Sequence, residues 1–143
     1  MNALDEFYMR RCVQLARCGI GSTSPNPAVG ALIVCDGRII GEGYHIRAGE
    51  PHAEVNAVRS VREQDKALLP QSTMYVTLEP CPMCAGALAW SQIGRVVYGA
   101  SDPKRGFSMF SPSLMHPKTE VVSGVLAEDC SSLVTEFFRN KRR

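Results

Sequence analysis

The fold is set by residues 28–44, AVGALIVCDGRIIGEGY. Ala28 to Cys35 form a continuous apolar run of strand length, which predicts a strand buried on both faces. Asp36-Gly37 is a strong hairpin signal, and Arg38 to Tyr44 are expected to return as the second strand. The sheet is therefore expected to begin with an antiparallel hairpin.

A helix is predicted before this hairpin, over Ala3 to about Cys18. Apolar residues recur there at helical spacing, so we expect one face to be buried. The predicted buried face consists of Leu4, Phe7, Tyr8, Cys12 and Leu15.

Helices and strands alternate after the hairpin. Proline suits the first position of a helix, so prolines are expected to open two of these helices. A polar loop is expected between the second helix and the third strand. The predicted elements are a helix over 51–62, a loop over 63–72, a strand over 73–78, a helix over 82–90, a strand over 94–100, an irregular stretch or short helix over 101–118, a strand over 120–124 and a final amphipathic helix from Leu126.

This order predicts an α/β fold in which helices cover both faces of one sheet, with parallel strands after the hairpin. A length of 143 residues predicts a single domain over 1–143. With 45% hydrophobic and 21% charged residues, a largely disordered chain is excluded. No apolar run approaches the ~20 residues that would span a bilayer, so no membrane partner is expected.

The six cysteines bear on the compartment. The N-terminal residues MNALDEFYMRR carry early acids and no apolar core of a signal peptide, so we expect a cytoplasmic protein. In a reducing compartment a close pair such as Cys81 and Cys84 favours metal binding or redox chemistry over a structural disulfide.

Two short motifs carry the candidate chemistry: Pro51-His52-Ala53-Glu54 and Glu79-Pro80-Cys81-Pro82-Met83-Cys84. Each is expected to open a helix. Three-residue spacing places the two thiols on one helix face, and a helix N-terminus favours thiolates. With His52 as a third ligand, Zn²⁺ would keep a fourth position open, which is the pattern of catalytic zinc that activates water.

Glu54 lies two positions after the histidine and is not needed as a ligand. A carboxylate there is suited to take a proton from water and return it to a leaving amine. The H-x-E and P-C-x-x-C pair is the signature of zinc nucleobase deaminases. A structural zinc knuckle would need a fourth protein ligand at knuckle spacing, and a redox pair would leave His52 and Glu54 without a role.

At these motifs the chain resembles the cytidine deaminase superfamily over nearly its whole length. The resemblance implies a three-layer αβα sandwich with a central five-stranded mixed sheet. It also implies one zinc per subunit and assembly into a homodimer or larger oligomer. Glu54 would be catalytic, and the metal ligands would be His52, Cys81 and Cys84.

Two branches of the superfamily are resembled. SPNPAVGALIVCDGRIIGEGYH and GEPHAEVNAVRSV are similar to the deaminase domain of the bifunctional riboflavin-pathway enzyme. YVTLEPCPMCAGALAWSQIGRVVYGASDPKRG, HPKTEVVSGVLAEDC and FFRNKRR are similar to bacterial tRNA-specific adenosine deaminases. The insert that riboflavin-pathway deaminases carry between the cysteines is only Pro82-Met83 here, and His45 stands where tRNA deaminases usually carry asparagine.

Further site residues follow from this resemblance. Asn26 lies between two prolines, where the resemblance favours a rigid amide that binds substrate over a plain turn residue. His45 ends the second strand and is either a pocket residue or a structural one. Trp90 is expected to pack rather than to stack on a base. The predicted substrate-binding residues are Asn26, His45, Ala53, Pro80 and Asp102.

The net charge is +2, and four of the 16 basic residues lie within the last five positions. Basic side chains are favourable near a helix C-terminus even without a ligand, but such a cluster would also neutralise phosphates. The expected nucleic-acid contacts are Lys104, Arg105, Phe138, Arg139 and Arg142.

The sequence thus predicts a zinc-dependent hydrolytic deaminase, acting first of all on adenosine in tRNA. The second candidate substrate is the diaminopyrimidine ribosylamino phosphate of riboflavin synthesis, and the third is a free base such as guanine or cytosine. An alternative of another class is a zinc-containing module that binds RNA without catalysis. Release of ammonia from any substrate would exclude that module.

Overall fold

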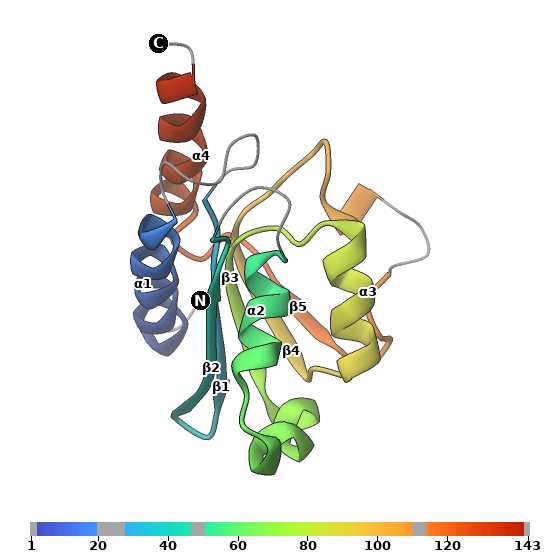
Figure 1. Cartoon of the computed structure of the whole chain (residues 1–143). Helices are drawn as coiled ribbons and strands as arrows, with labels where there is room; N and C mark the ends of the chain where they lie inside the picture. The colour runs from blue at the N-terminus through green and yellow to red at the C-terminus, as the bar shows by residue number, and fades with distance from the viewer. Residues whose placement is uncertain (1–2, 20–27, 47–50, 110–113, 142–143) are drawn as a thin grey trace.

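The computed structural model describes residues 3–19, 28–46, 51–109 and 114–141, and of residues 137–141 it describes the backbone alone. One sheet lies between two layers of helices, with α1 and α4 on one face and α2 and α3 on the other (Figure 1). This confirms the predicted α/β sandwich. Among the described residues, no helix combines the length and the apolar content that crossing a membrane requires.

The five strands lie in the order β2-β1-β3-β4-β5. β1 is antiparallel to both β2 and β3, whereas β3, β4 and β5 run parallel, so the sheet is mixed as expected. The bounds of the strands are β1 Gly30–Cys35, β2 Arg38–Tyr44, β3 Thr73–Leu78, β4 Arg95–Ala100 and β5 Glu120–Val122.

The hairpin between β1 and β2 forms as the sequence predicts. Asp36 and Gly37 both have positive φ, 49° and 75°, as a two-residue hairpin turn demands. Every residue of β1 is buried. Alternate side chains of this strand serve two cores: Ile33 faces the α2 and α3 layer, and Leu32 faces the α1 and α4 layer.

The helices are α1 Ala3–Cys18, α2 Ala53–Ser60, α3 Pro82–Ser91 and α4 Ala127–Lys141. The second helix is shorter than predicted, because His52 and Val61 have extended backbone and cap its two ends. The predicted loop over 63–72 is wrong, since Glu63–Gln71 form a 3₁₀-helix. Arg38 anchors this helix through Asp65 at 3.0 Å.

The predicted inner face of α1 is partly wrong. Leu4 and Phe7 are 66% and 62% exposed, whereas Asp5 and Met9 are 2% and 0% exposed. Asp5 turns inward because it binds Arg95 and Tyr75 on the sheet. The buried stripe therefore lies about one position further along the helix than hydrophobicity alone indicates.

The expectation that Trp90 packs within the chain is also wrong. Its side chain is 90% exposed at the end of α3. Met83, at the other end of the same helix, is 63% exposed. An apolar stripe of α3 therefore faces outward.

Candidate metal centre and active site

His52 and Glu54 enter the site from the beginning of α2. His52 is the N-cap residue, with φ −71° and ψ 167°, so its ring stands outside the helical turn. Glu54 lies in the first turn and is only 4% exposed. The extended backbone before Ala53 thus places a ring and a carboxylate side by side at one helix end.

Cys81 and Cys84 approach from the beginning of α3. Cys81 is the N-cap, with φ −73° and ψ 167°, and Pro82 follows at the first helical position. Proline is favoured there because its missing N–H would have had no helical partner. Cys84 is fully buried one turn further along. Free N–H groups at the helix start favour negative charge on both sulfurs.

The three side chains converge in a geometry that fits zinc. The Nδ1 atom of His52 lies 3.7 Å from Sγ of Cys81 and 3.4 Å from Sγ of Cys84. All three ligand atoms lie within 4.8 Å of one another. A tetrahedral zinc at ~2.3 Å from sulfur and ~2.0 Å from nitrogen requires S···N separations of roughly 3.5 Å. The donor set and its spacing therefore fit the metal.

Hydrogen bonding shifts the pKa values of Cys81 and Cys84 in opposite directions. The hydrogen bond from Cys84, followed by that from His52, lowers the pKa of Cys81 to about 4. The pKa of Cys84 is raised, because its proton is held by Cys81 and because it is buried. The neighbouring thiolate raises the pKa of His52. Metal ligands bind in the deprotonated form, so the lowered pKa of Cys81 suits that role.

Glu54 has a different electrostatic environment. Burial raises the pKa of its carboxyl to about 7, against an ordinary 4.5. The carboxyl can therefore gain or lose a proton near neutral pH, as a general acid–base group must.

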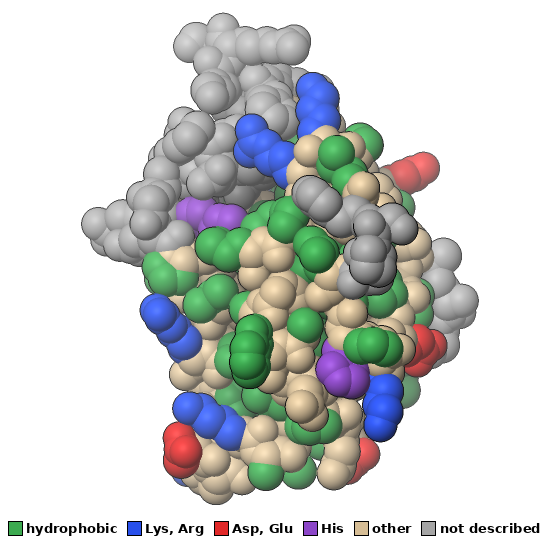
Figure 2. Space-filling view, turned by 90° about the vertical axis from the view of Figure 1, so that its right-hand side faces the viewer, with side chains coloured by type: hydrophobic (Ala, Val, Ile, Leu, Met, Phe, Trp, Pro, Cys, Tyr) green, Lys and Arg blue, Asp and Glu red, His purple; other side chains and the backbone are tan. Residues whose placement is uncertain are grey.

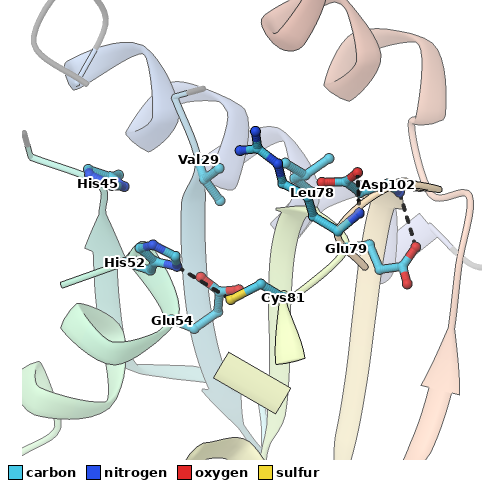
Figure 3. Close-up of a pocket in the computed structure, with 9 residues that line it drawn as sticks. Val29, His45, His52, Glu54, Leu78, Glu79, Cys81 and Asp102 are labelled. Carbon is cyan, nitrogen blue, oxygen red and sulfur yellow. Dashed lines mark hydrogen bonds between the residues drawn. The ribbon is translucent and has the colours of Figure 1, made fainter. Parts of the chain in front are cut away.

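A cavity of about 80 Å³ opens in front of these groups (Figure 3). His45 is 3% exposed, and the centre of its ring lies 5.3 Å from that of His52. The cavity is lined by Val29, His45, His52, Glu54, Leu78, Glu79, Cys81, Asp102 and Arg105.

The structure brings some of the predicted substrate-binding residues together and not others. His45 and Asp102 line the cavity. Ala53 and Pro80 are buried next to His52 and Cys81 but are not among the residues that line the cavity. Asn26 lies outside the described residues.

The predicted nucleic-acid contacts divide in the same way. Lys104 and Arg105 are exposed on the segment after β4, and Arg105 lines the cavity. The side chains of Phe138, Arg139 and Arg142 lie outside the described part of the chain.

Sequence reasoning missed three residues of the cavity: Val29, Leu78 and Glu79. Glu79 had a usable signal, because a charged residue that directly follows a buried strand needs a partner. The two apolar residues carried no signal, since their strands are apolar throughout.

Comparison with known proteins agrees with this site. Residues 2–100 match the family model of the cytidine and deoxycytidylate deaminase zinc-binding region. The chain is 42% identical over 147 residues to the riboflavin biosynthesis protein RibD of Escherichia coli, which covers 96% of this chain and 38% of the relative. It is 44% identical over 150 residues to the tRNA-specific adenosine deaminase of Haemophilus influenzae, covering 96% of this chain and 85% of the relative.

The fold has the same relatives. A diaminohydroxyphosphoribosylaminopyrimidine deaminase/5-amino-6-(5-phosphoribosylamino)uracil reductase from Thermotoga maritima superposes with a TM-score of 0.80 at 37% identity, over 96% of this chain and 42% of that one. The chain thus spans well under half the length of its riboflavin-pathway relatives. Both predicted resemblances are confirmed, and each extends over almost the whole chain. The chain belongs to the family of the cytidine and deoxycytidylate deaminase zinc-binding region.

Proposed function

We propose that this deaminase acts on adenosine in tRNA, at the wobble position of the anticodon. One observation carries the proposal. The cavity beside His52, Cys81 and Cys84, the metal group, adjoins a larger groove that is suited to a polynucleotide. The relatives named as tRNA-specific adenosine deaminases add support, since they match along 85–91% of their own length.

The groove has a volume of about 510 Å³ and lies between the segment after β4 and helix α4. It shares Leu78, Asp102 and Arg105 with the smaller cavity, so the two adjoin each other. Lys104 and Arg105 supply cations that can neutralise phosphates. Apolar and hydroxyl side chains complete a surface suited to neighbouring nucleotides, namely Ala100, Ser101, Pro103, Ser131, Val134 and Thr135.

In the proposed reaction, water adds to the ring carbon that bears the amino group, the C–N bond breaks, and ammonia leaves a carbonyl behind. His52, Cys81 and Cys84 would hold zinc, which when bound supplies a Lewis acid that activates water near pH 7. Glu54 accepts a proton at the floor of the cavity and donates it to the departing nitrogen. Its raised pKa suits both transfers.

A second candidate substrate is the diaminopyrimidine nucleotide of riboflavin synthesis. His45 favours it, because its buried ring lines the smaller cavity, which suits a small ligand. The RibD relatives and the Thermotoga maritima structure favour it as well. In this reading Arg105 would bind the single phosphate, and the groove would stay empty.

The decisive measurement is ammonia release by zinc-loaded protein from two substrates. One is an anticodon stem-loop with a wobble adenosine, with the guanosine stem-loop as its control. The other is the diaminopyrimidine nucleotide. We expect turnover of the adenosine RNA, a rate that falls with added salt, and a higher KM in Lys104→Gln. Turnover of the nucleotide alone would contradict the tRNA proposal, and no ammonia from either would leave a free base or a binding module.

We also propose that the active form is a homodimer in the cytoplasm. The outward stripe of α3 consists of Met83, Gly86, Ala87 and Trp90, and neither end turn of the helix carries a charge. Figure 2 shows this face, where hydrophobic side chains occupy the middle and charged ones lie toward the margins. Large exposed apolar residues in one patch mark interaction sites.

The stripe is complementary to itself. Two large residues seven positions apart flank a small centre, so an antiparallel copy of α3 would place Met83 against Trp90 of the partner subunit twice around a two-fold axis. Such isologous contacts are the usual basis of dimers. A cytoplasmic address agrees with free Cys81 and Cys84, because reducing conditions keep thiols available for metal.

Gly86→Leu tests the dimer. A Cβ at Gly86 meets nothing within 4 Å, so the subunit should fold, while the added side chain would separate the two helices. Light scattering should give a dimer for the parent and a monomer for Gly86→Leu. Ala67→Leu, on the exposed side of the 3₁₀-helix, is the control and should remain dimeric. A parent protein that is monomeric at all concentrations would rule the interface out.

A further inference from the structure

We propose that Glu79 is a positioning residue of this deaminase. Its carboxylate holds the segment Ser101–Ser108 in the one conformation that places Asp102 and Arg105 at the cavity. The inference rests on the proposed function in one respect: the cavity beside the metal group is taken as the place where substrate binds.

Glu79 directly follows β3 and is 4% exposed. Its backbone N–H donates to the carbonyl of Ala100 at 2.9 Å, so it extends the pairing of β3 with β4. In Figure 3 its carboxylate points away from Cys81 and Glu54, toward the segment after β4. Glu79 therefore acts on the cavity through this segment rather than through the metal group.

Three hydrogen bonds join the carboxylate to both ends of the segment. Oε1 accepts from the backbone N–H of Asp102 at 3.1 Å. Oε2 accepts from the backbone N–H of Ser108 at 2.9 Å and from its hydroxyl at 2.6 Å. A buried carboxylate is costly unless such donors replace water. The segment is therefore folded around a single side chain.

Gly106 shows how closely the segment surrounds the carboxylate. A Cβ at this position would overlap the carboxylate of Glu79. Two backbone bonds complete the loop: Gly106 N–H donates to Asp102 at 2.8 Å, and Phe107 N–H donates to Pro80 at 2.9 Å. Any residue larger than glycine would push the segment away from the carboxylate.

The consequence reaches the cavity through Asp102. With its backbone fixed by Glu79, the Asp102 carboxylate accepts from the N–H groups of Lys104 and Arg105 at 3.2 and 3.0 Å. Arg105 is thereby placed between the small cavity and the groove. Loss of the Glu79 clamp would displace the two side chains that bind substrate and leave the metal ligands where they are.

Glu79→Gln tests the clamp with an isosteric side chain. An amide has a single acceptor oxygen, so its NH₂ group must face the N–H donors of either Asp102 or Ser108. We expect amide hydrogen exchange to accelerate in residues 101–108 and to stay unchanged in α1. Zinc content should equal that of the parent. On whichever of the two substrates turns over, kcat/KM should fall on the order of 100-fold, and the loss should be carried by KM with little change in kcat.

Two further variants keep the test decisive if Glu79→Gln does not fold. Ser108→Ala, at an exposed position, removes one of the three hydrogen bonds and should give a smaller rise of KM in the same direction. Gly106→Ala should also raise KM, and it should do so less in a Glu79→Ala background, where the added methyl has room. Met109→Ala, directly after the segment, is the control, because its side chain is 55% exposed and not part of the clamp.

Unchanged exchange in 101–108, or an unchanged KM in all three variants, would overturn the proposal. Loss of zinc from Glu79→Gln would overturn it too, because Glu79 would then act on the metal group. The exchange measurement needs no substrate. If neither substrate is turned over, the proposed function fails, while the clamp is still decided by exchange.

Discussion

A buried carboxylate lies near each end of the parallel strands, and its surroundings lower its pKa at one end and raise it at the other. At their amino ends lies Asp5, which is 2% exposed. Its carboxylate accepts hydrogen bonds from Nη1 and Nη2 of Arg95 at 2.8 and 2.9 Å and from the hydroxyl of Tyr75 at 2.7 Å. Arg95 lowers the pKa of Asp5. At their carboxyl ends, Glu54 is 4% exposed, and burial raises its pKa to about 7.

The opposite pKa shifts of Asp5 and Glu54 have different physical causes. Burial by itself favours the neutral carboxyl, and only a well-placed cation reverses that preference. Asp5 has such a cation and contributes to stability. Glu54 is dominated by burial, which penalises its ionised form, so its carboxyl is suited to gain or lose a proton near neutral pH.

The largest expected effect is on turnover. Glu54→Gln should lower kcat by ~10²–10⁴-fold, because it removes the proposed proton carrier and keeps the side-chain volume. Zinc content, measured by metal analysis, and the midpoint of thermal unfolding should not fall. Ammonia release at the parent rate would show that Glu54 is a structural residue like Asp5.

The next effect is on stability, at the opposite end of the sheet. Asp5→Asn should lower the free energy of unfolding by about 3–5 kcal/mol, because Arg95 loses the buried one of its two carboxylate partners. Glu120→Gln is the control: it removes the exposed second partner of Arg95, at 3.4 Å, and should cost under about 1 kcal/mol. Urea titration measures both, and equal losses in the two variants would refute the special role of Asp5.

The pH dependence of stability should separate the two carboxylates in metal-free protein. The raised pKa of Glu54 gives stability that is complete below pH 4.5 and is lost as pH rises through about 7, amounting to about 3 kcal/mol. The lowered pKa of Asp5 gives stability that is present above pH 3.8 and is lost as pH falls further.

The variants assign each part of this profile. The difference between parent and Glu54→Gln should grow from pH 5 to pH 8, in favour of the variant. The difference between parent and Asp5→Asn should shrink in acid, below pH 4. A Glu54→Gln difference that stays constant across neutral pH would mean that Glu54 does not titrate there.

The smallest effect concerns the rotation of α1 that Asp5 imposes. Phe7→Ser should change the free energy of unfolding by no more than about 0.5 kcal/mol, because the ring is 62% exposed. Met9→Ala is the matched buried position, at 0% exposure, and should cost about 2–5 kcal/mol. A costly Phe7→Ser with a silent Met9→Ala would mean that the hydrophobic pattern, not Asp5, orients the helix.

Local patterns were enough to predict most of the fold and the centre of the site. The turn at Asp36-Gly37 fixed the hairpin, because its backbone conformation is available to few residue pairs. The three-residue spacing of Cys81 and Cys84 at a helix start predicted two thiols on one helix face, and the structure places both beside His52. These features depend on neighbours in the chain, which a sequence displays directly.

The tertiary structure alone decided the rest. Asp5 and Arg95 are 90 residues apart, so nothing near Asp5 shows that α1 turns Leu4 and Phe7 outward. Glu79 meets Ser108 across 29 residues, and the exposure of Trp90 depends on which helices cover which face. A buried charge is satisfied by whatever the fold brings to it, and that partner is set by the packing of the whole chain rather than by residues next to it in the sequence.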